Sequence, residues 1–80
     1  MPVILRLEGF KFFFYSNEGA PLEPAHVHVR KAGDEAKFWL SPQVELARND
    51  GFDATTLGRV ARMISSHQGY FKEAWNEYFS

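Results

Sequence analysis

The chain has 80 residues, a formal net charge of -1 at pH 7 and no cysteine. The lack of cysteine excludes disulfides, thiolate metal sites and cysteine nucleophiles, and the balanced charge gives no electrostatic indication of nucleic-acid binding. No apolar run approaches the about 20 residues of a membrane helix, and no secretory signal pattern is present. We therefore expect one cytoplasmic domain over residues 1–80 that contacts neither membrane nor nucleic acid.

The first third of the chain is typical of short strands. Apolar residues alternate over 3–7 and aromatic residues fill 10–15, which predicts two strands with a bulge or a turn at Gly9. Residues 16–24 contain Asn, Gly and Pro and predict a loop. Aromatic residues make up 16% of the chain, so either the core is aromatic or part of this surface contacts a partner.

A hairpin with a tight, glycine-containing turn is predicted over residues 24–40. Because successive side chains of a strand alternate faces, His26, His28 and Arg30 share one face. The valines between them point toward a core. This is the only stretch in which the sequence concentrates residues typical of catalysis or metal binding.

The remainder predicts a short edge strand over 43–47, a turn at 49–51 and then a helix. Asp53 is a good N-cap, and Phe52 and Leu57 occupy the two positions of a hydrophobic staple. An apolar face with three-four spacing follows. Its residues are Leu57, Val60, Ala61, Ile64, Phe71, Trp75, Tyr78 and Phe79.

The length of this helix sets a geometric problem. A continuous helix over 54–79 would be about 39 Å long, whereas a compact domain of this size is about 30 Å across. The helix therefore either breaks near Gly69 or projects onto another molecule. The apolar face, with His67 midway along it, keeps its phase across Gly69, which favours one helix. The sequence thus predicts an α+β domain: a small, mainly antiparallel sheet of three to five strands, covered on one face by a long C-terminal helix.

Several motifs are specific in combination and cover almost the whole chain. They are Pro24-Ala25-His26-Val27-His28-Val29, Glu35-Ala36-Lys37-Phe38-Trp39-Leu40, Val44-Glu45-Leu46-Ala47-Arg48-Asn49, Gly51-Phe52 and Trp75-Asn76-Glu77-Tyr78-Phe79. With these motifs the sequence resembles the bacterial family catalogued as domain of unknown function 4160.

The resemblance implies no established activity. Members of the family are small, prokaryotic and often encoded beside another small protein, and some of these pairs look like toxin–antitoxin modules. Many relatives have a charged residue where Gln68-Gly69 stands here. This departure bears on the continuity of the helix.

The histidine pair allows three interpretations, of which the first is metal binding. Neutral imidazoles such as those of His26 and His28 are common ligands of zinc, copper and nickel. Two ligands are too few, and the third would come from Glu23, His67 or Asp34. If the helix covers the valine face of the strand, His67 lies on the wrong side to join the pair. We expect no stoichiometric metal and no cofactor.

The second interpretation is catalysis. His26 or His28 would act as a general base near neutral pH, and Arg30 or Lys31 would stabilise a phosphate transition state, as in a ribonuclease. No nucleophile motif accompanies these residues. In the third interpretation the histidines are structural and bond to nearby carbonyls, which is the role we expect for His67.

The leading functional hypothesis is a non-enzymatic binding module that partners and regulates a small neighbouring protein, as in a toxin–antitoxin pair. The alternative is a histidine-dependent enzyme, such as a small ribonuclease or a metal-binding hydrolase, that uses His26 and His28. The apolar helix face exceeds what one small sheet can cover, so we expect an interface at Trp75, Tyr78 and Phe79. The expected assembly is a homodimer, unless the neighbouring protein covers this surface.

Overall fold

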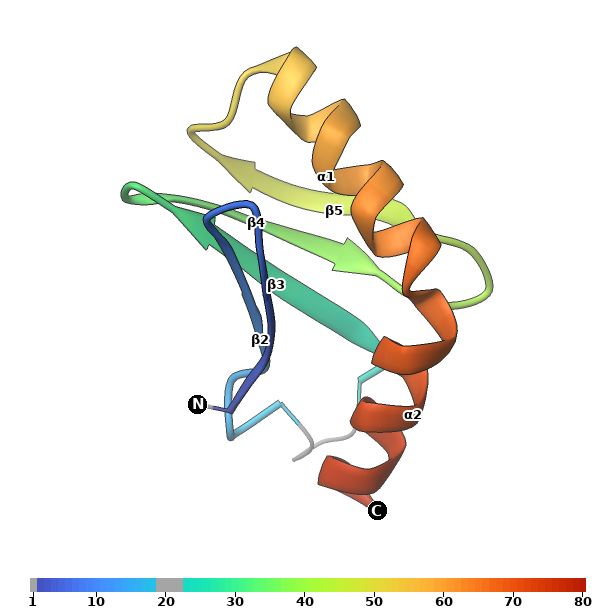
Figure 1. The fold of residues 1–80 in the computed structure, drawn as a ribbon. Coiled ribbons are helices and arrows are strands. Elements are labelled where there is room, and N and C mark those ends of the chain that lie inside the picture. The colour runs from blue at the N-terminus through green and yellow to red at the C-terminus, as the bar shows by residue number, and fades with distance from the viewer. Residues whose placement is uncertain (1, 19–22) are drawn as a thin grey trace.

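The structure, a computed structural model, describes residues 2–18 and 23–80. Within these residues the chain forms five β-strands followed by two α-helices (Figure 1). The strands are β1 (Val3–Leu7), β2 (Phe10–Phe13), β3 (His26–Lys31), β4 (Asp34–Trp39) and β5 (Glu45–Asp50). The helices are α1 (Ala54–Ser66) and α2 (Gln68–Phe79).

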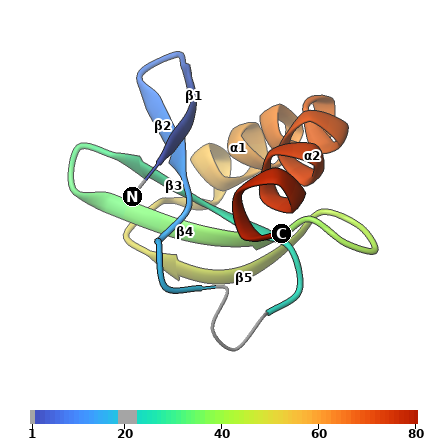
Figure 2. The ribbon, with the colours of Figure 1, turned by 90° about the horizontal axis from the view of Figure 1, so that it is seen from below.

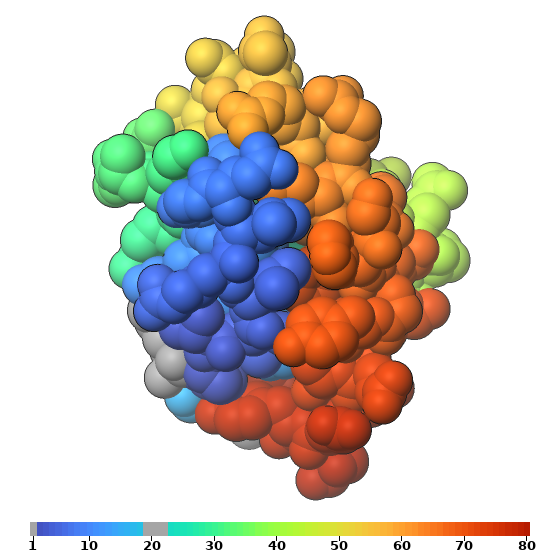
Figure 3. All heavy atoms as spheres, viewed as in Figure 1, coloured from blue at the N-terminus to red at the C-terminus, as the bar shows by residue number. Residues whose placement is uncertain are grey.

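The strands form one open antiparallel sheet in the order β1-β2-β3-β4-β5, so each strand pairs with the next one in the chain. The helices lie on one side of this sheet, and the hairpin of β1 and β2 turns up beside them (Figure 2). In the space-filling view, this hairpin and the helices form adjoining parts of the surface (Figure 3). The predicted α+β class is confirmed, with the number of strands at the upper end of the expected range.

Two of the strand connections are two-residue turns with left-handed backbone. Glu8 and Gly9 connect β1 to β2 with φ angles of 51° and 83°, and Ala32 and Gly33 connect β3 to β4 with φ angles of 50° and 88°. Two consecutive positive φ angles match the twist of a tight hairpin, and glycine adopts them at little cost. Gly9 therefore belongs to a turn, and the predicted hairpin turn at Gly33 is confirmed.

The edge strand β5 is longer than the sequence predicts. A strand over 43–47 and a turn at 49–51 are expected, but β5 stays paired with β4 through Asn49 and as far as Asp50. Residues whose types favour turns are thus held in the ladder by their cross-strand partners. The chain leaves the sheet only at Gly51, where φ is 113°.

The helices and the inner face of the sheet enclose a largely aromatic core. Val27 and Val29 of β3 are fully buried in it, as the alternation along the strand predicts. The other members are Phe10, Phe12, Phe14, Ala36, Phe38, Leu40, Phe52, Val60, Met63, Ile64, Phe71 and Trp75. Because the core lies on the valine side of β3, the histidine side faces away from it.

The start of α1 has the cap that the sequence predicts. Asp53 has an extended backbone, and its Oδ1 accepts a hydrogen bond from the Thr56 backbone N–H at 2.7 Å. Phe52 is buried and Leu57 packs against the core. The entry angle of the helix is therefore fixed on both sides of the cap.

The helical segment breaks at His67, where φ is -119° and ψ is 19°. The ring Nδ1 of His67 lies 2.8 Å from the Met63 carbonyl oxygen, and its backbone N–H donates to the Ile64 carbonyl at 3.0 Å. These bonds tighten the last turn of α1 and end it. The favoured prediction of one continuous helix is therefore wrong, and the break lies two residues before Gly69. The longest extent of the molecule is 34 Å. Neither helix has the length and apolar run needed to cross a membrane, within the described residues.

The end of α2 packs on the protein instead of projecting from it. Trp75 is 4% exposed, and its ring centroid lies 5.3 Å from that of Phe14 and 4.2 Å from that of Phe79. Trp75 is thus a core residue and not part of an exposed apolar surplus, which corrects that expectation. Phe79 is half-buried, whereas Tyr78 remains 44% exposed.

Truncating Phe71 tests the packing of α2. Its side chain is fully buried, and its ring centroid lies 5.4 Å from that of Phe12. We expect Phe71→Ala to lower the free energy of unfolding by about 3–5 kcal/mol, measured by urea denaturation. The neighbouring Tyr70 is 53% exposed. Tyr70→Ala should therefore lower the free energy of unfolding by only about 1 kcal/mol, mostly because the hydrogen bond that its hydroxyl donates is lost. Equal losses in the two variants would contradict the packing.

The cap of α1 predicts a pH-dependent stability. Hydrogen bonds from the backbone and the side chain of Thr56 lower the pKa of Asp53 below its ordinary value of 3.8. The stability that this carboxylate contributes is therefore complete above the unfolded pKa and is lost as the pH falls through the folded pKa. We expect Asp53→Ala to lower the melting temperature near neutral pH, and the deficit to shrink toward about pH 3. A deficit that stays constant over this range would mean that the charge plays no part.

Candidate functional site

The face of the sheet that points away from the core carries the predicted histidines. In the paired strands, Phe13 lies opposite His28, and Trp39 lies opposite His26. Directly opposed residues share a face of the sheet, so aromatic rings flank both imidazoles. His26 is 0% exposed and His28 is 7% exposed. The pair is therefore a buried polar cluster, not a solvated surface.

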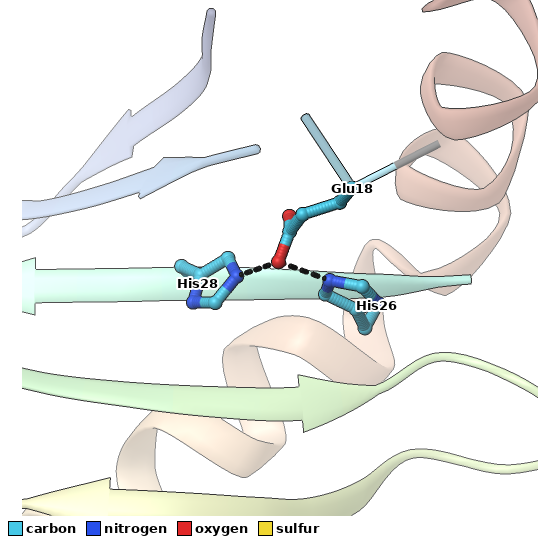
Figure 4. A group of neighbouring side chains, drawn as sticks. All are labelled: Glu18, His26 and His28. Atoms are coloured by element: carbon cyan, nitrogen blue, oxygen red, sulfur yellow. Dashed lines mark hydrogen bonds and ion pairs between the residues drawn. The ribbon is translucent and has the colours of Figure 1, made fainter. Parts of the chain in front are cut away.

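Figure 4 shows Glu18 reaching over β3 to both histidines. Its Oε2 lies 2.7 Å from Nε2 of His26 and 2.6 Å from Nε2 of His28. Its other oxygen, Oε1, accepts a hydrogen bond from the Tyr15 backbone N–H at 3.1 Å. In residues 2–18 and 23–80, this is the only group of three or more possible metal ligands whose ligand atoms all lie within 4.8 Å of one another.

The surroundings of His26 show which of its nitrogens is free. Nδ1 lies 2.9 Å from the Pro24 carbonyl oxygen, which can only accept, so Nδ1 carries a hydrogen. In the neutral imidazole, Nε2 then has a lone pair. This Nε2 is buried and, although it lies 2.7 Å from Oε2 of Glu18, it has no partner in hydrogen-bonding geometry among residues 2–18 and 23–80. A lone pair that faces a carboxylate oxygen is repelled unless a cation, either a proton or a metal ion, lies between them.

His28 stacks on Phe13 at 5.5 Å between ring centroids and meets Tyr15 edge-on at 4.5 Å. Its Nδ1 lies 3.7 Å from Oε2 of Glu35. Burial lowers the pKa of His28, and the carboxylate of Glu18 opposes this only in part. Burial alone would raise the pKa of Glu18, but its hydrogen bond to His28, its close contact with His26 and the hydrogen bond from the Tyr15 N–H outweigh burial and hold that pKa below its usual value. The site thus pairs an ionised carboxylate with a His28 that resists protonation.

Arg30, the predicted transition-state stabiliser, is engaged elsewhere. Its Nη2 and Nε donate to Oε1 of Glu35 at 2.7 and 3.1 Å, and the Tyr15 hydroxyl donates to Oε2 of Glu35 at 2.9 Å. Burial and the Glu35 carboxylate raise the pKa of Tyr15, so its hydroxyl keeps its proton. These contacts hold Glu35 behind Nδ1 of His28. Lys31 lies on the other face of the strand.

None of the three residues predicted as a third ligand reaches the histidine pair. Glu23 pairs with Lys37 at 3.2 Å, and Asp34 lies at the far end of the β3–β4 hairpin. His67 bonds to the Met63 carbonyl on the helix side. The geometric argument that excluded His67 is therefore confirmed.

Glu18 is the site residue that sequence reasoning misses. It lies ten residues before His28, in a turn that follows β2. A residue in a loop has no periodicity that places its side chain over a strand. Its only signal is that it is an acidic residue in the loop leading back to the histidine strand.

One side of the cluster opens into a pocket of about 320 Å³. The lining residues are Tyr15, Glu18, His28, Glu35, Ala36, Lys37, Arg48 and Asp50. Glu18 and His28 therefore belong to both the cluster and the pocket, while His26 is not among the lining residues. Two imidazole nitrogens and a carboxylate form a donor set typical of divalent transition metals.

A comparison with protein families identifies the relatives of this chain. The family model described as Domain of unknown function (DUF4160) matches residues 9–76, which include the whole cluster. The chain therefore belongs to this family, as its motifs predict. No curated protein and no solved structure matches it.

Proposed function

We propose that this member of the DUF4160 family is a small metal-dependent hydrolase whose metal ligands are Glu18, His26 and His28. The observation that carries the proposal is the buried Nε2 of His26, which has no hydrogen-bond partner in the part of the chain that the structure describes and lies 2.7 Å from a carboxylate oxygen. A divalent cation held between these atoms turns this repulsion into coordination.

The surroundings of the ligands support a metal rather than a shared proton. Histidines that bind metals usually donate their other ring nitrogen to a carbonyl or a carboxylate, which orients the ring. Nδ1 of His26 donates to Pro24, and Nδ1 of His28 faces Glu35 at 3.7 Å. Metal–nitrogen bonds are about 2.0–2.1 Å long, so the donor atoms need to spread slightly. A small shift of Glu18 in its turn accommodates this change.

The number of ligands indicates a catalytic centre. Structural zinc sites are closed by four protein ligands, whereas catalytic sites have three and keep one position for water or substrate. Among the described residues three possible protein ligands converge, and the pocket lies on the open side of Glu18 and His28. A metal ion in such a site lowers the pKa of a bound water and supplies a nucleophile near neutral pH.

Metal titration tests the ligand set. We expect chelator-treated protein to bind about one equivalent of Co²⁺, with the visible spectrum of nitrogen and oxygen ligation. Loss of a residue that only orients a metal ligand weakens metal binding about 10–100-fold. His26→Ala and Glu18→Gln each remove a ligand itself, so each should weaken Co²⁺ binding by more than this. His67→Ala is the matched control, because this histidine lies on the helix side, and it should bind as the unchanged protein does. Circular dichroism verifies the fold of each variant.

Hydrolysis of chromogenic esters tests the catalytic part of the proposal. Metal-loaded protein should cleave 4-nitrophenyl esters faster than the chelator-treated protein, and Glu18→Gln should abolish the difference. If the protein binds the metal stoichiometrically but shows no metal-dependent hydrolysis, the metal site stands and the proposed hydrolase activity is contradicted. Absence of binding in protein that is folded would contradict both parts.

The second candidate is a non-enzymatic binding module that partners a small neighbouring protein, or a second copy of this chain, in the cytoplasm. The observation that favours it is β5, an edge strand whose six residues are all exposed. Edge strands can pair with a strand of another chain. Two antiparallel copies of β5 that bring Glu45 of one close to Arg48 of the other would pair opposite charges.

Light scattering at micromolar concentration separates the possible contacts. We expect a dimer mass that Leu46→Lys reduces to that of a monomer, because the added charge opposes strand pairing across this edge. Tyr78→Lys changes an exposed side chain at the helix end and should leave the dimer intact. Loss of the dimer only with Tyr78→Lys would place the contact at the end of α2. A monomer mass for every variant would contradict the homodimer, and a different protein would then have to pair with β5.

A further inference from the structure

We propose that the pocket beside the centre takes a phosphate ester, whose phosphoryl oxygens bind the metal, Lys37 and Arg48. This inference rests on the proposed metal site and names the substrate class of that site. It starts from the row of residues that crosses the outer face of the sheet at His28.

Register places two cations in line with the metal ligands. His28 of β3 lies opposite Lys37 of β4, and Lys37 lies opposite Arg48 of β5. Opposed residues on neighbouring strands share a face, with Cβ atoms about 5 Å apart. The row therefore runs from a ligand of the centre to two long, positively charged side chains, and all three residues line the pocket.

The charge of the pocket depends on the metal. Three carboxylates, those of Glu18, Glu35 and Asp50, line it together with the two cations, so without a metal the pocket is acidic in balance. A divalent ion reverses this balance, and the loaded pocket attracts an anion. Arg30 adds to this preference from outside the pocket, because it already neutralises Glu35 at 2.7 Å.

Arg48 can exchange its present partner at little cost, whereas Lys37 is more enclosed, with its side chain 22% exposed. Lys37 pairs with Glu23 at 3.2 Å, and Arg48 pairs with Asp50 at 2.9 Å. The Arg48 and Asp50 side chains are 72% and 56% exposed, and exposed ion pairs of this kind contribute little to stability. Arg48 donates to Asp50 through Nε, whereas a phosphoryl group can accept two parallel hydrogen bonds from a guanidinium.

The size of the pocket restricts the ligand to a small group. A volume of about 320 Å³ is at the lower end of the range for small-molecule sites. It accommodates a phosphoryl group with one attached residue, such as a nucleotide unit or a sugar phosphate. A free phosphomonoester and the exposed linkage of a larger phosphodiester share this chemistry, and the experiment distinguishes them.

The reaction consumes one water. Hydroxide formed from water on the metal attacks phosphorus, and the water's proton passes to solvent. The bond between phosphorus and the ester oxygen breaks, and the leaving oxygen keeps the electron pair and takes a proton from solvent. The metal and the two cations stabilise the charge that develops on the phosphoryl oxygens.

The test uses the Co²⁺-loaded full chain with inorganic phosphate as the probe. Phosphate should change the visible cobalt spectrum in a saturable way, and acetate should do so only at much higher concentration. Lys37→Gln and Arg48→Gln should each weaken phosphate binding about 10-fold or more, because each removes a charge-assisted hydrogen bond to a phosphoryl oxygen. Arg62→Gln, which changes an exposed arginine of α1, should have no effect.

Hydrolysis rates show whether the pocket takes a phosphomonoester or a phosphodiester. The loaded protein should prefer 4-nitrophenyl phosphate or bis(4-nitrophenyl) phosphate to 4-nitrophenyl acetate, and the faster of the first two identifies a monoesterase or a diesterase. A cobalt spectrum that phosphate leaves unchanged, or equal phosphate affinity in Lys37→Gln, Arg48→Gln and Arg62→Gln, overturns the phosphate inference and leaves the metal site standing. Preference for the acetate ester overturns it as well. Failure to load Co²⁺ removes the proposed function itself.

Discussion

The buried imidazole of His26 is the constraint on which the site depends. The ring lies between Trp39 and Trp75, at 5.6 and 4.6 Å between centroids, and its Nε2 has no hydrogen-bond partner among the residues that the structure describes. An unsatisfied buried polar group costs about 1–3 kcal/mol, which is a large share of the stability of a small domain. Because Trp75 comes from α2, the same packing that completes the core also encloses this nitrogen. Fold and site are therefore coupled through one aromatic contact.

The division of the sheet into two faces explains how so small a chain has room for a polar site. Helices α1 and α2 pack on the valine side of β3, where aromatic and aliphatic side chains fill the core. On the opposite side, burial comes from Phe13, from Glu18, which reaches over the strand, and, at His26, from Trp75 of α2. The histidines on that face are screened from water by aromatic rings and by the carboxylate of Glu18. This arrangement lowers the pKa of His28 while still allowing access from the pocket.

Patterns that depend on neighbouring residues predict most of the fold. Alternation along β3 identifies the faces of Val27 and His28, and the type of residue at Asp53 identifies the cap of α1, because both effects act within a few residues. The helix break is not predicted by such patterns. His67 ends α1 through its own bonds to the preceding turn, whereas the apolar spacing continues unchanged across the break. The end of β5 is not predicted either, because pairing with β4 holds Asn49 in a strand although asparagine favours turns.

The third residue of the cluster could not be predicted for a related reason. Glu18 acts through two oxygens with separate tasks, since Oε1 binds the Tyr15 backbone N–H and Oε2 faces the histidines. The first bond is local, because Tyr15 lies three residues before Glu18. The second depends on how the loop returns to the sheet, which no periodicity specifies. Glu23 is closer to His26 in sequence but pairs with Lys37 instead. In a site of this kind the strand supplies two ligands by alternation, and tertiary structure alone selects which loop carboxylate completes it.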